Sequence, residues 1–191
     1  MKIVMQYKKI ILIGAGILLI LLLLIFGLRG CGVSHKSPEG VVKSLIKAYA
    51  NGKEGKIKAC YGVKKEMDET LQQEIDATIK YIKAHNPKNV EVEECDVLSE
   101  DNNYAYTYIT YNLILENDQA YPCVSTYMTT KIDGKYYVLG PSDITDDMRK
   151  QASSDYAKFM TTNTYKEYTK NYETFIKKNP GYEDKIASKL S

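Results

Sequence analysis

The chain has 191 residues, and its 26 basic and 24 acidic residues leave a formal net charge of +2. Both signs are intermixed, so the sequence offers neither the basic face expected of a nucleic-acid-binding protein nor an acidic tail. Tryptophan is absent, whereas tyrosine occurs 17 times. The sequence contains no metal-ligand spacing, phosphate-binding loop or nucleophile motif, so we expect no metal, no cofactor and no catalytic activity.

Residues 10–28 form an apolar run without a charged side chain. As a helix, such a run matches the ~30 Å hydrocarbon core of a membrane. We therefore predict a cytoplasmic tail over 1–9, a transmembrane anchor over 10–28 and a linker over 29–36. Basic residues precede the run, which favours placing the rest of the chain outside the cytoplasm.

A second interpretation makes Cys31 a lipidation site. Leu28 and Gly30 stand where the bacterial lipobox has a leucine and a small residue, although Arg29 departs from that pattern. The length of the apolar run favours a spanning anchor over a lipoprotein. A cleaved signal peptide fits less well, because its apolar core usually has about 7–15 residues.

Three helices are expected next. The first starts at Ser37, a good N-cap, and ends at Asn51. A short second helix ends before Gly62, and a third runs from Asp68 to His85. Histidine in a last helical turn suits the helix dipole, so we expect His85 to be a cap or surface residue rather than a catalytic one.

The hydrophobic pattern then changes to the period of β-strands. Four segments rich in Val, Ile, Thr and Tyr, separated by turn signals, predict an antiparallel meander over 90–98, 104–116, 121–132 and 135–140. We take Asn117–Asp118 and Asp133–Gly134 as two-residue turns. Alternation then collects on one face, which the helices should cover, Ala105, Thr107, Ile109, Tyr111, Leu113, Val124, Met128, Ile132, Tyr137 and Leu139.

Tyr104, Tyr106 and Tyr108 fall on the opposite face of the same strand. Three rings in line can form a docking surface for a partner, or they can simply pack across strands. Both interpretations stay open.

Three cysteines lie beyond the linker, and an oxidising compartment would allow a disulfide. The predicted register puts Cys95 and Cys123 on opposite faces, which argues against a bond between them. Cys60 on a covering helix could instead reach Cys95. Buried free thiols that behave as small apolar residues are an equally good interpretation.

Residues 141–191 return to helical spacing. We expect Thr164 and Glu167 to form a capping box at the start of one of these helices. Its aromatic stripe comprises Tyr165, Tyr168, Tyr172 and Phe175. This extension either folds back on the domain or presents the stripe to a partner, and the first alternative is favoured because amphipathic helices normally bury their stripe.

Three helices and then a meander, with the start Ser37-Pro-Glu-Gly-Val-Val and the helix end Ala48-Tyr-Ala-Asn-Gly-Lys, resemble the NTF2-like cone fold over 37–140. More narrowly, they resemble small membrane-attached or lipoprotein domains of Gram-positive bacteria. The resemblance implies an α+β cone of three helices on a curved four-stranded antiparallel sheet, with 141–191 as a helical extension. Members of this superfamily use the cone pocket for small ligands, for isomerase or dehydratase chemistry, or for protein contacts.

The sequence therefore predicts a single-pass membrane protein with an outward domain that acts as a binding or assembly module. Its expected partners are the membrane and either another protein or a second copy of itself, with a small ligand in the cone as a further option. A short inner tail, one anchor and an outer NTF2-like domain is also the layout of VirB8-like scaffold subunits of type IV secretion and conjugation machines. A ligand-binding lipoprotein or sensor is the other alternative.

Overall fold

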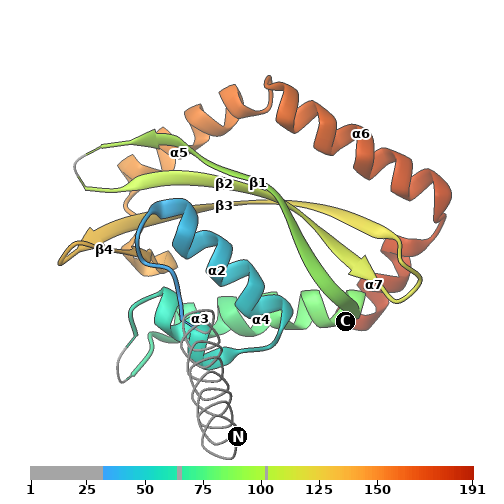
Figure 1. Cartoon of the computed structure of the whole chain (residues 1–191), viewed down its shortest axis with the longest axis horizontal. Coiled ribbons are helices and arrows are strands. Elements are labelled where there is room, and N and C mark those ends of the chain that lie inside the picture. Colours follow the sequence, from blue (N-terminus) through green and yellow to red (C-terminus); the bar gives the residue numbers. More distant parts are fainter. Residues whose placement is uncertain (1–31, 64–65, 102) are drawn as a thin grey trace, which may run out of the picture. The chain divides into compact units, whose positions relative to one another are not determined.

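A computed structural model describes residues 32–63, 66–101 and 103–191 of the chain (Figure 1). Residues Val33–Ser191 form one compact unit. The predicted tail, the anchor over 10–28 and Cys31 lie outside the described residues. Of the helices in the described part, none is long and apolar enough to cross a membrane.

Three helices open the compact unit: α2 (Pro38–Ala50), α3 (Glu54–Cys60) and α4 (Glu69–His85). The Ser37 hydroxyl accepts a hydrogen bond from the Gly40 N–H at 3.1 Å and caps α2. Asp68 caps α4 in the same way through the Leu71 N–H at 3.3 Å. Asn86 ends α4 in the left-handed conformation. The three predicted helices are thus confirmed, because their start and stop signals are local.

The four strands form one antiparallel sheet in the order β1 (Pro87–Glu100), β2 (Ala105–Leu115), β3 (Ala120–Ile132) and β4 (Lys135–Val138). The predicted α+β class and meander are confirmed. Asp133 and Gly134 form the predicted two-residue turn, and both have positive φ, as the favoured hairpin turn requires.

The hairpin between β2 and β3 differs from the prediction. The Leu115 N–H donates to the Gln119 carbonyl at 2.8 Å, so the loop contains the three residues 116–118. Asp118 adopts φ 63°, the left-handed conformation that a three-residue loop needs. The extra loop residue shifts the pairing by one position and exchanges the two faces of β3.

This shift corrects the predicted helix-covered face. Tyr111 pairs with Cys123 and not with Val124. The β2 residues are on the predicted face, but their partners in β3 are the odd-numbered residues Tyr121, Cys123, Ser125, Tyr127 and Thr129. Val124 and Met128 therefore lie on the opposite face. At the far end of β3, Ile132 is 54% exposed and is not covered by any of the described helices. In β4, Val138 pairs with Thr129, so Val138 takes the place on this face that was predicted for Tyr137 and Leu139.

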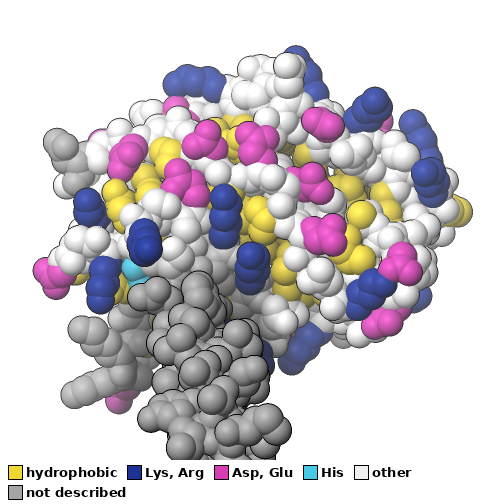
Figure 2. Space-filling model, in the orientation of Figure 1, with side chains coloured by type: hydrophobic (Ala, Val, Ile, Leu, Met, Phe, Trp, Pro, Cys, Tyr) yellow, Lys and Arg dark blue, Asp and Glu magenta, His cyan; other side chains and the backbone are white. Residues whose placement is uncertain are grey.

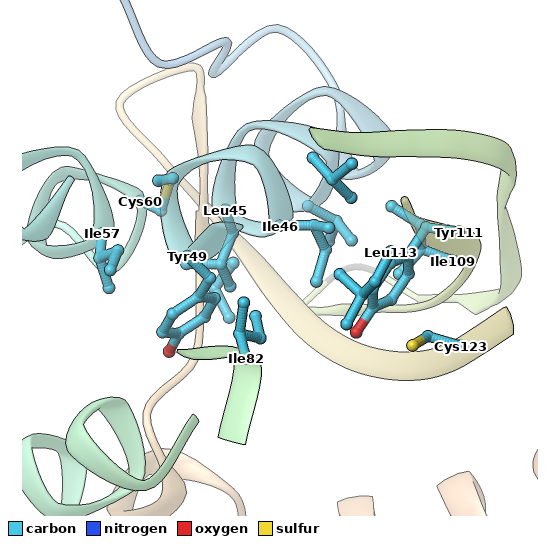
Figure 3. Packing of buried hydrophobic residues seen from close by; sticks show 14 of the residues in the cluster. Leu45, Ile46, Tyr49, Ile57, Cys60, Ile82, Ile109, Tyr111, Leu113 and Cys123 are labelled. Atoms are coloured by element: carbon cyan, nitrogen blue, oxygen red, sulfur yellow. The ribbon is translucent and has the colours of Figure 1, made fainter. Parts of the chain in front are cut away.

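Helix α2 packs on the odd-numbered face of β2, called here the inner face, and α3 and α4 pack against α2. Buried residues of all three helices and of the sheet form one core. Figure 3 shows side chains of this core, which come from α2, α3, α4 and the sheet. Its fully buried members include Val41, Leu45, Ile57, Ile75, Ile109 and Leu113.

The C-terminal helices follow a short 3-10 turn, η1 (Pro141–Asp143), and are α5 (Asp146–Phe159), α6 (Asn163–Lys178) and α7 (Tyr182–Leu190). In Figure 1, α5 and α6 lie on the other side of the sheet from α2 and α4. Helix α7 packs along α4. Phe159, Phe175 and Ile186, one from each helix, are buried. The extension therefore folds back on the domain.

The start of α6 is two residues earlier than predicted. The Thr162 hydroxyl accepts a hydrogen bond from the Tyr165 N–H at 3.3 Å and is the N-cap. Thr164 lies inside the first turn, and its hydroxyl donates to Glu94 Oε2 at 3.1 Å. The predicted capping box at Thr164 is therefore wrong. The sequence did not distinguish the two because Thr162 and Thr164 are both residues that can cap a helix.

Candidate functional site

A groove of about 480 Å³ opens between α4, β3 and α6. It lies beside the part of β3 that β4 does not reach, because β4 pairs only with residues Thr129–Ile132. We call it the tyrosine groove, and it is lined by Ala77, Thr78, Tyr81, Ile82, Tyr111, Tyr121, Pro122, Cys123, Val124, Ser125, Tyr127 and Tyr168. Five of these are tyrosines and none is charged, so the lining consists of aromatic faces, hydroxyls and aliphatic groups.

The tyrosine hydroxyls are held by one another and by a carboxylate. The Tyr81 and Tyr121 hydroxyls lie 3.4 Å apart, and that of Tyr111 lies 3.4 Å from Ser125 Oγ. The Tyr121 hydroxyl also donates to Glu183 Oε1 at 2.8 Å. The bond to Glu183 is the short one and orients the Tyr121 ring, whereas the two contacts at 3.4 Å are long for O–H···O hydrogen bonds.

Burial further disfavours ionisation of the groups that line the groove. It raises the pKa of Tyr168 and of the Cys123 thiol to about 12, and it raises the pKa of Tyr111 well above its usual value. The phenols therefore stay protonated at physiological pH and offer both a donor and an acceptor.

A second hydroxyl cluster adjoins the groove at α4. The Tyr49 hydroxyl lies 3.3 Å from that of Tyr61, which donates to Glu74 Oε1 at 3.5 Å. Burial raises the pKa of Glu74, which is one helical turn from the groove residue Thr78. Tyr49, Tyr61 and Glu74 do not themselves line the groove.

His85 is buried and not a surface cap. It is 5% exposed, and its ring lies 4.3 Å from the Tyr121 ring and 4.7 Å from the Tyr81 ring. His85 Nδ1 is 2.9 Å from the Tyr182 hydroxyl, whereas Nε2 has no partner within the described residues. Burial lowers the pKa of His85 to about 4. The expectation failed because α7, which covers His85 through Tyr182, is distant in sequence.

The predicted row on the opposite face is mostly covered. Tyr106 and Tyr108 are 7% and 6% exposed, and the Tyr108 ring packs 4.4 Å from Phe159 of α5. Tyr104 is half-buried and borders a depression shared with α5. Tyr106 and Tyr108 are therefore packing residues in this structure and do not form an exposed docking surface.

The predicted stripe on α6 serves several contacts. Tyr165 packs against Phe159, with ring centroids 5.4 Å apart. Tyr168 lines the tyrosine groove. Phe175 belongs to the buried core, and Tyr172 packs against that core. Only Tyr168 of this stripe thus lies at the candidate site.

The described cysteines are free thiols, which is the second of the two interpretations left open by the sequence, and not a bond between Cys60 and Cys95. Cys95 Sγ instead lies 3.9 Å from the Glu39 carbonyl oxygen. Cys95 pairs with Ile109, and Cys123 pairs with Tyr111 two residues further along β2, so both face the same side. This corrects the predicted placement on opposite faces. Burial raises the pKa of Cys60 to about 12, as expected of an inert thiol.

Charged groups do not gather at the surface that Figure 2 shows, where acidic and basic side chains are interspersed over the described residues. Across the described ranges, no group of three or more His, Cys, Asp or Glu side chains is arranged to hold a metal ion.

Comparison with protein-family models and with curated proteins finds no match. Among solved structures, the chain is similar to a Campylobacter jejuni protein provisionally described as an NTF2-like transpeptidase. The two are 21% identical over 54% of this chain and 97% of the other, with a TM-score of 0.37. A likeness at this level carries no argument about fold or activity.

Sequence reasoning missed the groove residues Tyr81, Tyr121 and Ser125. The available signal was the unusual number of tyrosines, 17 without a tryptophan. The number of tyrosines does not show which of them line a binding site, because tyrosine is common in strands, in cores and in binding sites alike.

Proposed function

We propose that the chain is an NTF2-like binding or assembly module, anchored in a membrane by residues 10–28 and facing outward, that recognises its partner through the tyrosine groove. The observation that supports this function is the lining, with five tyrosines and no charged residue. Tyrosine rings supply a large contact area at low entropic cost, and their hydroxyls adapt to donors and acceptors.

The order of elements supports the NTF2-like assignment. Three helices precede a four-stranded antiparallel sheet, and their buried residues share one core with its inner face. The chain adds α5, α6 and α7 to that arrangement, and α6 contributes Tyr168 to the groove. Of the appended helices, α6 is therefore part of the proposed site.

The lining favours binding over catalysis. Among the described residues that line the groove there is no carboxylate, imidazole or amine, the groups that most often transfer protons in enzymes. The pKa of a tyrosine is ordinarily about 10, and burial raises the pKa of Tyr168 further, so its phenol is neutral at physiological pH.

Site-specific photocrosslinking tests the proposal in the protein's own membranes. The photoreactive residue p-benzoylphenylalanine replaces Tyr168 in the full chain, and a matched chain carries it at Tyr104. Both tyrosines are half-buried, but only Tyr168 lines the groove. We expect a discrete protein adduct from position 168 and none from position 104.

An adduct from position 104 alone, or none from either position, would count against the groove as the binding site. Truncation after Gly140 is a poor alternative, because it removes the buried residues Phe159, Phe175 and Ile186 from the packed unit.

A further inference from the structure

The edge of β3 beside the tyrosine groove has no neighbouring strand in the described part of the chain. The pairing of β3 with β4 extends only as far as Thr129. Beyond it, one more hydrogen bond runs from the Leu139 N–H to the Met128 carbonyl at 2.8 Å. Gly140 and Pro141 then lead the chain into η1. The first part of β3, up to Tyr127, is left as an edge.

The register shows which backbone groups face this edge. In an antiparallel pair, alternate residues point both their N–H and C=O toward the partner strand. Gln119 bonds to β2, so odd-numbered β3 residues face β2, whereas Met128 bonds toward β4, so even-numbered residues face outward. Val124 and Thr126 thus present an N–H and a C=O each. No hydrogen bond within the described residues engages these groups.

Pro122 fits the same pattern, because its position is one whose N–H would also face outward. Proline is tolerated where a strand has an open edge and is excluded where the ladder needs a donor. Residues 124–127 are half-buried, whereas Tyr121, Cys123 and Met128 on either side are buried. The accessible window is therefore the short stretch that carries the unpaired groups.

The other edges of the sheet are protected. Strand β1 contains three register irregularities and carries Glu91, Glu93, Glu94 and Asp96, and both features discourage strand addition. The outer edge of β4 is engaged by His35, whose carbonyl accepts from the Tyr136 N–H at 3.0 Å. Only the window beside the tyrosine groove combines an edge with an uncharged lining among the described strands.

We propose that this window takes up an extended, uncharged segment of the partner protein as an added β-strand. Unpaired N–H and C=O groups in strand geometry are matched best by another extended backbone. The occupant is a single segment and not the sheet edge of a second folded copy, because Tyr81 of α4 and Tyr168 of α6 flank the groove. This inference rests on the function proposed above and specifies the chemistry of the partner.

The test uses a capped heptapeptide of alternating threonine and valine with one central tryptophan. The full chain, solubilised in detergent, contains no tryptophan, so the peptide's tryptophan emission, excited at wavelengths that tyrosine does not absorb, reports binding. Val124→Pro removes one outward N–H and leaves the pairing with β2 intact. Val124→Thr keeps the N–H and nearly the same shape, and is the matched control.

We expect Val124→Pro to bind about tenfold more weakly than Val124→Thr, and a fully N-methylated peptide not to bind. Replacing the peptide valines with lysine should also abolish binding. Should Val124→Pro fail to fold, amide hydrogen exchange on wild type replaces it, and the peptide must slow exchange at Val124 and Thr126.

Equal binding of the N-methylated peptide, or unchanged exchange at those two amides, would overturn strand addition. So would the absence of binding by the unmodified peptide at about 1 mM, the weak end of the affinity scale. The function proposed above is judged separately by the crosslink from position 168. A crosslink without strand pairing would mean that the groove binds its partner through side chains alone.

Discussion

The two faces of the sheet both carry rows of tyrosines but use them differently. On the outer face, α5 covers Tyr106 and Tyr108, and Phe159 packs directly on Tyr108. On the inner face, Tyr121 and Tyr127 line the tyrosine groove, which opens at the edge of β3 between α4 on this side of the sheet and α6 on the other (Figure 1). The same residue type is therefore core on one side and candidate binding surface on the other. What decides between the two is the position of the covering helix.

The largest expected effect tests whether the outer face is a true core. Phe159→Ala should destabilise the protein by about 3–5 kcal/mol, because it empties a fully buried ring site above Tyr108. Urea denaturation measures the loss. Met160→Ala, at a neighbouring residue that is 42% exposed, is the control and should cost less than about 0.5 kcal/mol. Similar small losses for both would mean that α5 does not seal this face.

The next effect concerns His85 on the inner side. Burial lowers the pKa of His85 to about 4, with Lys189 acting in the same direction and Glu183 against it. The unfolded chain therefore takes up the proton first as the pH falls through about 6.5. Stability should be full above that pH and decline by about 3 kcal/mol by pH 4.

Other groups also titrate in this range, so the measurement is a difference. Urea denaturation at several pH values compares wild type with His85→Phe, which keeps a ring in the cluster but cannot be protonated. The variant should show a shallower loss between pH 6.5 and 4. Parallel pH profiles would contradict a buried neutral imidazole.

A matched pair of hydroxyl deletions compares the two faces directly. Tyr121→Phe removes a bond to the Glu183 carboxylate and should cost about 1.5–3 kcal/mol. Tyr106→Phe on the outer face removes a neutral bond to Thr126 Oγ1 at 3.0 Å and should cost about 0.5–1.5 kcal/mol. Thermal unfolding of both variants gives the order, and a reversed order would mean that water satisfies the groove hydroxyls.

The smallest expected effect concerns the start of α6, the helix that reaches both regions. Thr162→Ala removes the observed N-cap and should cost about 1 kcal/mol. Thr164→Ala removes only an exposed contact to Glu94 and should cost less than about 0.5 kcal/mol. Denaturation curves of the two variants distinguish the observed cap from the one that sequence favoured. A larger loss at Thr164 would favour the predicted start.

Several features were predictable because their causes lie within a few residues. Ser37 and Asp68 cap the helices that follow them, and Asp133–Gly134 makes the expected tight turn. The loop at 116–118 was not predictable, since an aspartate at Asp118 is compatible with a two-residue or a three-residue turn. The one additional loop residue exchanged the two faces of β3, and it thereby changed which β3 side chains lie beside Tyr111 in the candidate site.

Sequence alone thus determined which segments are helices or strands, their order, and the presence of aromatic stripes, since backbone propensity and hydrophobic period are local properties. Tertiary structure alone decided that Tyr108 is covered, that His85 is buried beneath Tyr182, and that Tyr81, Tyr127 and Tyr168 line one groove. These residues come from elements far apart in the chain. Their proximity depends on how the helices pack on the two faces of the sheet, and no local sequence pattern predicts that packing.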